Sequence, residues 1–67
     1  MITLAAPPPD SPAVAALRSE LARACAATER AQDAACRRPS RSTLAALEAA
    51  AGYERGMREA LRLITSR

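Results

Sequence analysis

The sequence predicts an all-α fold, an antiparallel two-helix hairpin, on the strength of three observations. Apolar residues recur at helical spacing over two segments, about residues 13–37 and 41–65. The short stretch "RRPSRS" separates them, and connections of a few residues place helices side by side and antiparallel. Large apolar side chains are few, whereas 18 of the 67 residues are alanine. We therefore expect the hairpin to be completed by a partner or by homodimerisation into a four-helix bundle.

Residues 1–12, "MITLAAPPPDSP", are predicted to form a proline-rich N-terminal arm, and residues 13–67 the helical hairpin. Consecutive prolines favour extended polyproline geometry and cannot continue a helix. We expect the arm to be flexible or to lie over a surface.

The first helix has clear boundaries in the sequence. Ser11 or Asp10 can cap it, and Pro12 suits the first helical position, where its missing N–H costs nothing. Pro39 disfavours helix at Arg38, which places the end near residue 37. The face predicted to be apolar comprises Val14, Leu17, Leu21, Ala24, Cys25, Thr28, Ala31, Ala35 and Cys36.

The second helix is predicted to follow a cap at Ser40 or Ser42. Its apolar stripe comprises Leu47, Ala50, Tyr53, Met57, Ala60, Leu61 and Ile64. The opposite face is polar and comprises Glu48, Arg55, Glu59 and Arg62, of which Arg55 and Glu59 form an i,i+4 pair.

Both glycines of the chain fall in the second helix, within "AGYERGM", where each costs about 1 kcal/mol relative to alanine. They belong to a ridge of small residues, namely Ala45, Ala49, Gly52, Gly56 and Ala60. Such a ridge lets another helix approach closely, and this helix is either the first helix of the hairpin or one from a partner. We expect the glycines to provide a contact surface at a cost in helix stability.

The residue types argue against enzymatic, cofactor and metal chemistry. The chain has no histidine for a general base, no Gly-rich phosphate loop and no CxxC or carboxylate cluster at metal spacing. We expect a protein that is not an enzyme and uses no cofactor or metal.

Nucleic-acid binding is a third and weaker hypothesis, in the form of a hairpin dimer. All ten basic residues are arginine, a bias typical of GC-rich bacterial genomes, and the net charge is only +3. Arg37, Arg38 and Arg41 cluster at the turn, but a single aromatic residue offers no platform for base stacking.

We expect a cytoplasmic protein, because neither a signal peptide nor a membrane span is visible. In that compartment Cys25 and Cys36 should be reduced and mostly buried. Eleven residues separate the two cysteines, about 16 Å along one helix, so they cannot bridge within it. Two antiparallel copies could instead pair Cys25 with Cys36 of the other chain.

The order of these features resembles a known family, the small cytoplasmic co-chaperone of the type III secretion needle subunit. The resemblance lies in "ALRSEL" (residues 16–21), in Pro39 at the turn, and in "GYERGMREALRLI" (residues 52–64). It implies a helical hairpin that binds a larger helical-repeat chaperone. Together the two proteins would keep a secreted needle subunit from polymerising.

The candidate partner-binding residues combine this resemblance with the helical pattern. They are Leu17, Leu21, Gly52, Tyr53, Gly56, Met57, Leu61 and Ile64. The alternative is a phage-type homodimer, a four-helix bundle that inhibits or adapts a host regulatory protein and buries the same stripes against a second copy.

Overall fold

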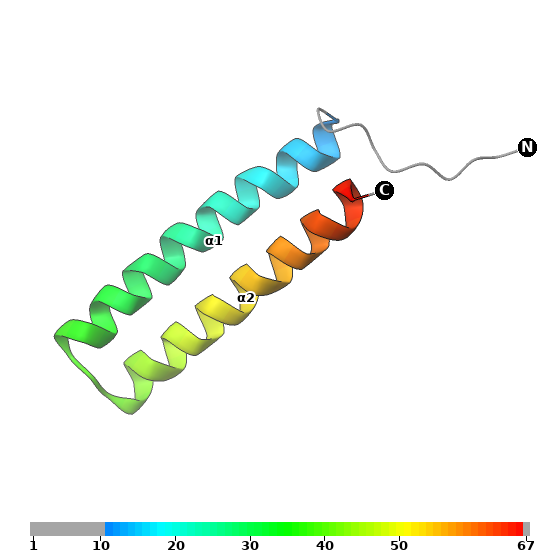
Figure 1. Ribbon diagram of the computed structural model, residues 1–67. Coiled ribbons are helices and arrows are strands. Elements are labelled where there is room, and N and C mark those ends of the chain that lie inside the picture. The colour runs from blue at the N-terminus through cyan, green and yellow to red at the C-terminus, as the bar shows by residue number, and fades with distance from the viewer. Residues whose placement is uncertain (1–10, 67) are drawn as a thin grey trace, which may run out of the picture.

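The computed structural model describes residues 11–66, which form two antiparallel helices side by side, joined by a tight turn (Figure 1). Helix α1 runs from Pro12–Arg37 and helix α2 from Arg41–Thr65. The all-α hairpin predicted from the sequence is confirmed. The predicted arm lies outside the described residues except at Ser11 and Pro12, which begin α1.

Helix α1 begins and ends where backbone chemistry requires it. The Ser11 side chain accepts a hydrogen bond from the Val14 amide at 3.2 Å, and Pro12 occupies the first turn. At the other end the Arg38 amide still donates to the Ala34 carbonyl at 2.9 Å, and Pro39 then prevents a further helical turn.

Helix α2 begins with a capping box that also closes the turn. The Ser40 hydroxyl accepts from the Thr43 amide at 3.1 Å, and the Ser40 amide donates to the Thr43 hydroxyl at 2.9 Å. The same hydroxyl donates to the Arg38 carbonyl at 2.9 Å. Thr43 therefore joins the end of α1 to the beginning of α2.

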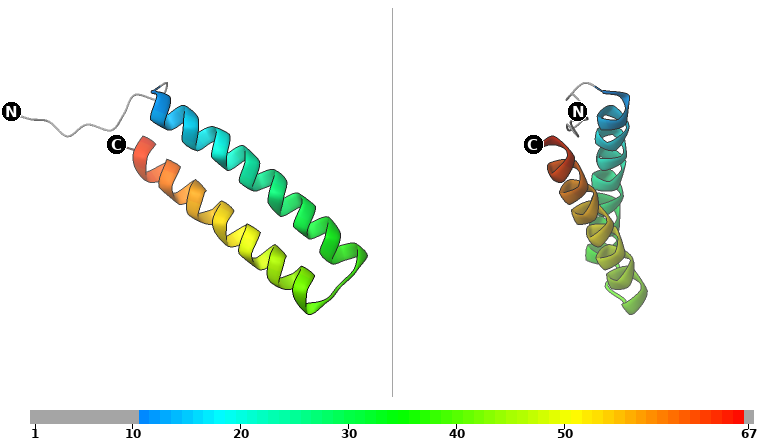
Figure 2. Two further views of the ribbon diagram at one scale, coloured as in Figure 1. Left: turned by 180° about the vertical axis from the view of Figure 1, so that it is seen from behind. Right: turned by 90° about the vertical axis from the view of Figure 1, so that its right-hand side faces the viewer.

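The two helices pack along one seam with the spacing of a coiled coil. Each helix carries an uninterrupted series of buried or half-buried residues at alternating spacings of three and four. The ribbons cross at a shallow angle when viewed from the side (Figure 2), as this packing requires. The seam residues are Val14, Leu17, Leu21, Ala24, Thr28, Ala31 and Ala35 in α1, and Thr43, Leu47, Ala50, Glu54, Met57, Leu61 and Ile64 in α2.

The core along this seam is thin. Within residues 11–66 only Val14, Ala24 and Ala35 are buried, and α2 contributes no buried residue. Leu44, Tyr53 and Leu63 are each more than half exposed. The hairpin thus leaves much of its large apolar surface in contact with solvent.

Two residues of the predicted apolar faces are exposed, and Cys25 and Ala60, both half-buried, lie outside the seam. Tyr53 is exposed and Glu54 takes the seam position, because the seam steps four residues from Ala50 and not three. Cys36 is exposed, because the seam of α1 ends at its neighbour Ala35. Both predictions are wrong for the same reason. The sequence pattern defines a broad apolar face, whereas the packing of the two helices uses only the narrow repeat within it.

The predicted Arg55–Glu59 pair is also replaced. Glu59 bonds instead to Arg62, whose Nε donates to the Glu59 Oε2 at 3.1 Å. Both arrangements connect exposed side chains one turn apart, so the exchange has little effect on stability.

Ser40→Ala should destabilise the hairpin by about 1 kcal/mol, because it removes the oxygen that accepts from the first turn of α2. Ser40→Gly is the matched control and should cost only a few tenths of a kcal/mol, since glycine leaves the amide accessible to water. Thermal unfolding followed by circular dichroism measures both. Unchanged stability of Ser40→Ala would show that the capping box contributes nothing.

Candidate protein-binding surface

The hairpin has two edges, one on each side of the seam, and one polar contact between the helices marks each of them. On one edge the Tyr53 hydroxyl donates to Glu20 Oε2 at 3.0 Å. On the other, Arg58 Nη2 donates to Cys25 Sγ at 3.5 Å. We call these the Tyr53 edge and the Arg58 edge. The alternating spacing of three and four residues along each helix assigns the remaining residues to one edge or the other.

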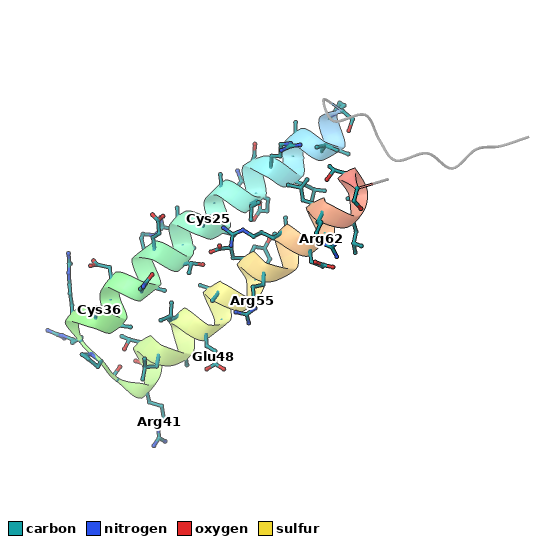
Figure 3. All side chains as sticks on the ribbon, in the orientation of Figure 1. Cys25, Cys36, Arg41, Glu48, Arg55 and Arg62 are labelled. Carbon is teal, nitrogen blue, oxygen red and sulfur yellow. The ribbon has the colours of Figure 1, made fainter. Side chains whose placement is uncertain are left out.

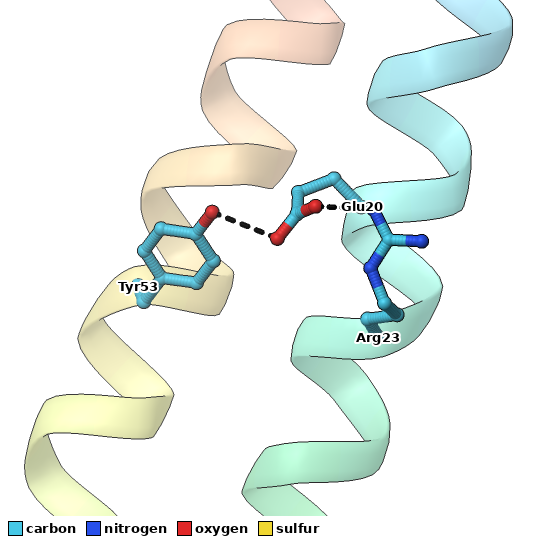
Figure 4. Close-up of polar contacts among 3 residues, drawn as sticks. All are labelled: Glu20, Arg23 and Tyr53. Atoms are coloured by element: carbon cyan, nitrogen blue, oxygen red, sulfur yellow. Dashed lines mark hydrogen bonds and ion pairs between the residues drawn. The ribbon is translucent and has the colours of Figure 1, made fainter.

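The contact that defines the Tyr53 edge is a three-residue chain (Figure 4). Arg23 forms an ion pair with Glu20, which accepts from Tyr53 through its other oxygen. The hydrogen bond from Arg23, followed by that from Tyr53, holds the pKa of Glu20 below its usual value. The bond to Glu20 raises the pKa of Tyr53. Tyr53 is therefore held in place although its side chain remains about half exposed.

Glu54 is the acidic residue of the seam, and its side chain is only 12% exposed. It pairs with Arg58, which in turn reaches Cys25 on α1. The side chain of Thr28 on α1 is the main cause that lowers the pKa of Glu54. Arg58 moves with Glu54 because both lie on α2, but a shift of either helix along the seam would break the contact with Cys25. The cluster thus favours one register of the pair.

Helix α2 carries a second repeat, on the Tyr53 edge, that α1 does not cover. Its members again alternate at spacings of three and four, none is charged, and all but Ala60 are exposed. We call these residues the α2 outer repeat: Ala46, Ala49, Tyr53, Gly56, Ala60 and Leu63.

The glycines do not serve the contact between α1 and α2. A Cβ atom added at Gly56 would meet nothing within 4 Å, and one added at Gly52 would meet only Arg55 Nη2 of the same helix, at 3.8 Å. Close packing of α1 against the small-residue ridge, one of the two readings drawn from the sequence, is therefore wrong. What remains is an open surface at Gly56 on the Tyr53 edge.

The structure divides the predicted partner-binding residues into two groups. Five lie half-buried in the seam, namely Leu17, Leu21, Met57, Leu61 and Ile64. Tyr53 and Gly56 belong to the exposed α2 outer repeat, and Gly52 lies beside it, half-buried. Leu63 belongs to neither of the two faces predicted for this helix from the sequence. Its spacing of seven residues from Gly56 is the signal that places it in the same repeat.

The Arg58 edge differs in carrying charged residues on both helices, whereas those of the Tyr53 edge lie on α1 alone. The repeat places on it Arg18, Glu29, Glu48, Arg55, Arg58 and Arg62. Figure 3 shows Glu48 and Arg55 on the side of α2 that faces away from α1. Mixed charges of this kind are typical of a solvated face.

The chemistry of the described part of the chain is limited. Among residues 11–66, no three His, Cys, Asp or Glu side chains come together in a group that could hold a metal ion. Cys25, half-buried, and Cys36, exposed, are both free thiols. Neither α1 nor α2 has the length and apolar character needed to cross a membrane. The feature that distinguishes the described surface is therefore the α2 outer repeat on the Tyr53 edge.

No protein-family profile, curated protein or solved structure matches the chain.

Glu54→Gln should weaken the dependence of stability on acid pH. The pKa of Glu54 in the folded chain lies below its ordinary value of 4.5. Its contribution is therefore present at neutral pH and is lost as the pH falls below about 4.5 through the folded pKa. Urea unfolding between pH 7 and pH 3 measures the effect. Glu48→Gln, which changes an exposed carboxylate of the same helix, should keep the wild-type profile.

Gly56→Ala should stabilise the isolated hairpin by about 1 kcal/mol, because alanine is the better helix former and the added methyl group meets no neighbouring atom. Denaturant unfolding followed by circular dichroism measures the gain. A loss of stability would show that Gly56 is needed for the fold itself.

Proposed function

We propose that this chain is a non-enzymatic protein-binding module that is completed by another protein. The observation that carries the proposal is the thin core: no residue of α2 is buried, and three leucine or tyrosine side chains are more than half exposed. Two helices that bury so little are only marginally stable in water. A partner that covers the exposed apolar residues would stabilise the folded hairpin through binding.

The specific form we propose is a co-chaperone in the bacterial cytoplasm. It would bind a helical-repeat chaperone and help to keep a secreted needle subunit unpolymerised. The resemblance of "ALRSEL", Pro39 and "GYERGMREALRLI" to that family supports this form. The hairpin supports it too, because a helical-repeat protein offers helices against which the open edge can pack.

The oligomeric state of the purified chain is the first measurement, by light scattering together with circular dichroism at several concentrations. The proposal expects a monomer whose helicity rises when a helical-repeat chaperone and its needle subunit are co-expressed with it. The three chains should then purify as one complex, and the subunit should form no fibres. A stable, strongly helical dimer that binds neither protein would instead favour the homodimeric inhibitor or adaptor.

Met57→Asp and Leu61→Asp should both abolish this complex, because each places a charge in the seam and unfolds the hairpin. Co-purification with the chaperone measures the loss of the complex, and circular dichroism measures the loss of helix. Full retention of the complex by both variants would contradict the co-chaperone proposal.

A further inference from the structure

We propose that the Tyr53 edge docks one helix of another protein, which carries small apolar residues along one stripe and acidic residues on the flank that faces α1. This inference rests on the proposed protein-binding function and names the chemistry of the partner.

The apolar part of this docking surface is the α2 outer repeat. It extends from Ala46 to Leu63, about 26 Å at the rise of a helix, with the same alternating spacing that packs α1 against α2. Tyr53 and Leu63 project from it, and Gly56 lies between them with open space above its Cα atom. A helix can therefore approach closely at Gly56, flanked by two large side chains.

The charged part of this docking surface lies on α1, along the same edge. Arg23, Arg30 and Arg37 follow one another at intervals of seven residues, about 10 Å apart along the helix. Arg30 has no ion pair among residues 11–66, and the side chains of Arg23 and Arg37 are 69% and 79% exposed although each pairs with an acid of its own helix. Three accessible arginines thus border an uncharged apolar surface.

This charge pattern distinguishes the possible occupants. A second copy would bring the same three arginines, and its α2 outer repeat contains no acidic residue to meet them. The only acid on this edge of α1, Glu20, is already bonded to Arg23 and Tyr53. A nucleic acid would leave the apolar repeat unused. An amphipathic helix with an acidic flank satisfies both the apolar and the charged part of the edge.

The chain offers a matched pair of variants for the test. Leu63 and Leu44 are the same residue type on the same helix and are equally exposed, at 54%. Leu63 lies on the Tyr53 edge, whereas Leu44, fourteen residues before Arg58, lies on the Arg58 edge. Leu63→Gln and Leu44→Gln therefore make the same change on opposite edges.

The probe is a pair of synthetic helical peptides that share one alanine and leucine stripe and carry either glutamate or lysine along one flank. Binding to the full chain is measured by calorimetry. The glutamate peptide should bind at least about tenfold more tightly than the lysine peptide. Leu63→Gln should weaken that binding about tenfold, whereas Leu44→Gln should leave it unchanged. Arg30→Gln should weaken it about threefold at low salt and have no effect at about 0.5 M salt.

Gly56→Gln separates docking from folding. The glutamine should raise the stability of the isolated hairpin, because it replaces a glycine in mid-helix where nothing obstructs it. It should nevertheless weaken binding of the glutamate peptide, because its side chain prevents close approach. A variant that gains stability and loses binding cannot be explained by unfolding.

Three results would overturn the proposal. The first is equal affinity for the two peptides, and the second is equal damage from Leu63→Gln and Leu44→Gln. The third is a dimer of the purified chain that Leu63→Gln abolishes and Leu44→Gln preserves, because a second copy would then cover the edge.

The same variants separate this proposal from the co-chaperone function. If the co-chaperone complex forms unchanged with Leu63→Gln and with Arg30→Gln, the docking proposal is rejected and the co-chaperone proposal stands. If that complex does not form but the chain still prefers the glutamate peptide, the co-chaperone proposal is rejected and the docking proposal stands.

Discussion

The seam between α1 and α2 is the contact on which the rest of this structure depends, and its limit is the size of the side chains that α1 brings to it. From Ala24 to Ala35, no seam residue of α1 is larger than threonine. Small side chains contribute little apolar burial, so this half of the hairpin gains little from packing. The larger residues are at the other end, where Val14 begins the seam of α1 and Ile64 ends that of α2. Hydrogen bonds at Ser40 and Thr43 secure the turn instead.

A seam this thin would tolerate several registers if all its residues were apolar, and Glu54 removes that freedom. Its carboxylate is nearly covered, yet Arg58 and Thr28 stabilise the charged form. Because the folded chain holds the pKa of Glu54 below its ordinary value, the attraction outweighs the cost of desolvation. Arg58, its partner on the same helix, also donates to Cys25 on α1, a contact that a shifted register would break. The polar cluster and the small apolar seam therefore act together to define one hairpin.

Helix α2 presents two repeats of the same spacing, and the hairpin uses only one of them. The second repeat includes Gly56, which weakens the helix and gains nothing from α1. Natural proteins often accept such a local loss of stability where function requires it. The arginines of α1 make the charge around that open surface asymmetric, because they lie along one side of it only. A thin core, an open repeat and an asymmetric charge thus agree with a chain completed by another protein.

Local features of the sequence are enough to predict the two helices and their antiparallel arrangement, because proline, serine caps and apolar spacing act within a few residues. Ser11, Pro12, Pro39 and Ser40 carry that information locally. The sequence could not decide which residues of α2 face α1, because Tyr53 and Glu54 are neighbours and both fit a broad helical face. Only the packing of two helices selects the narrow repeat that brings Glu54 into the seam, half-buried, and leaves Tyr53 exposed. The same packing places Gly56 on the open edge and not in contact with α1, because a helix that turns one repeat toward its neighbour turns the other repeat away from it.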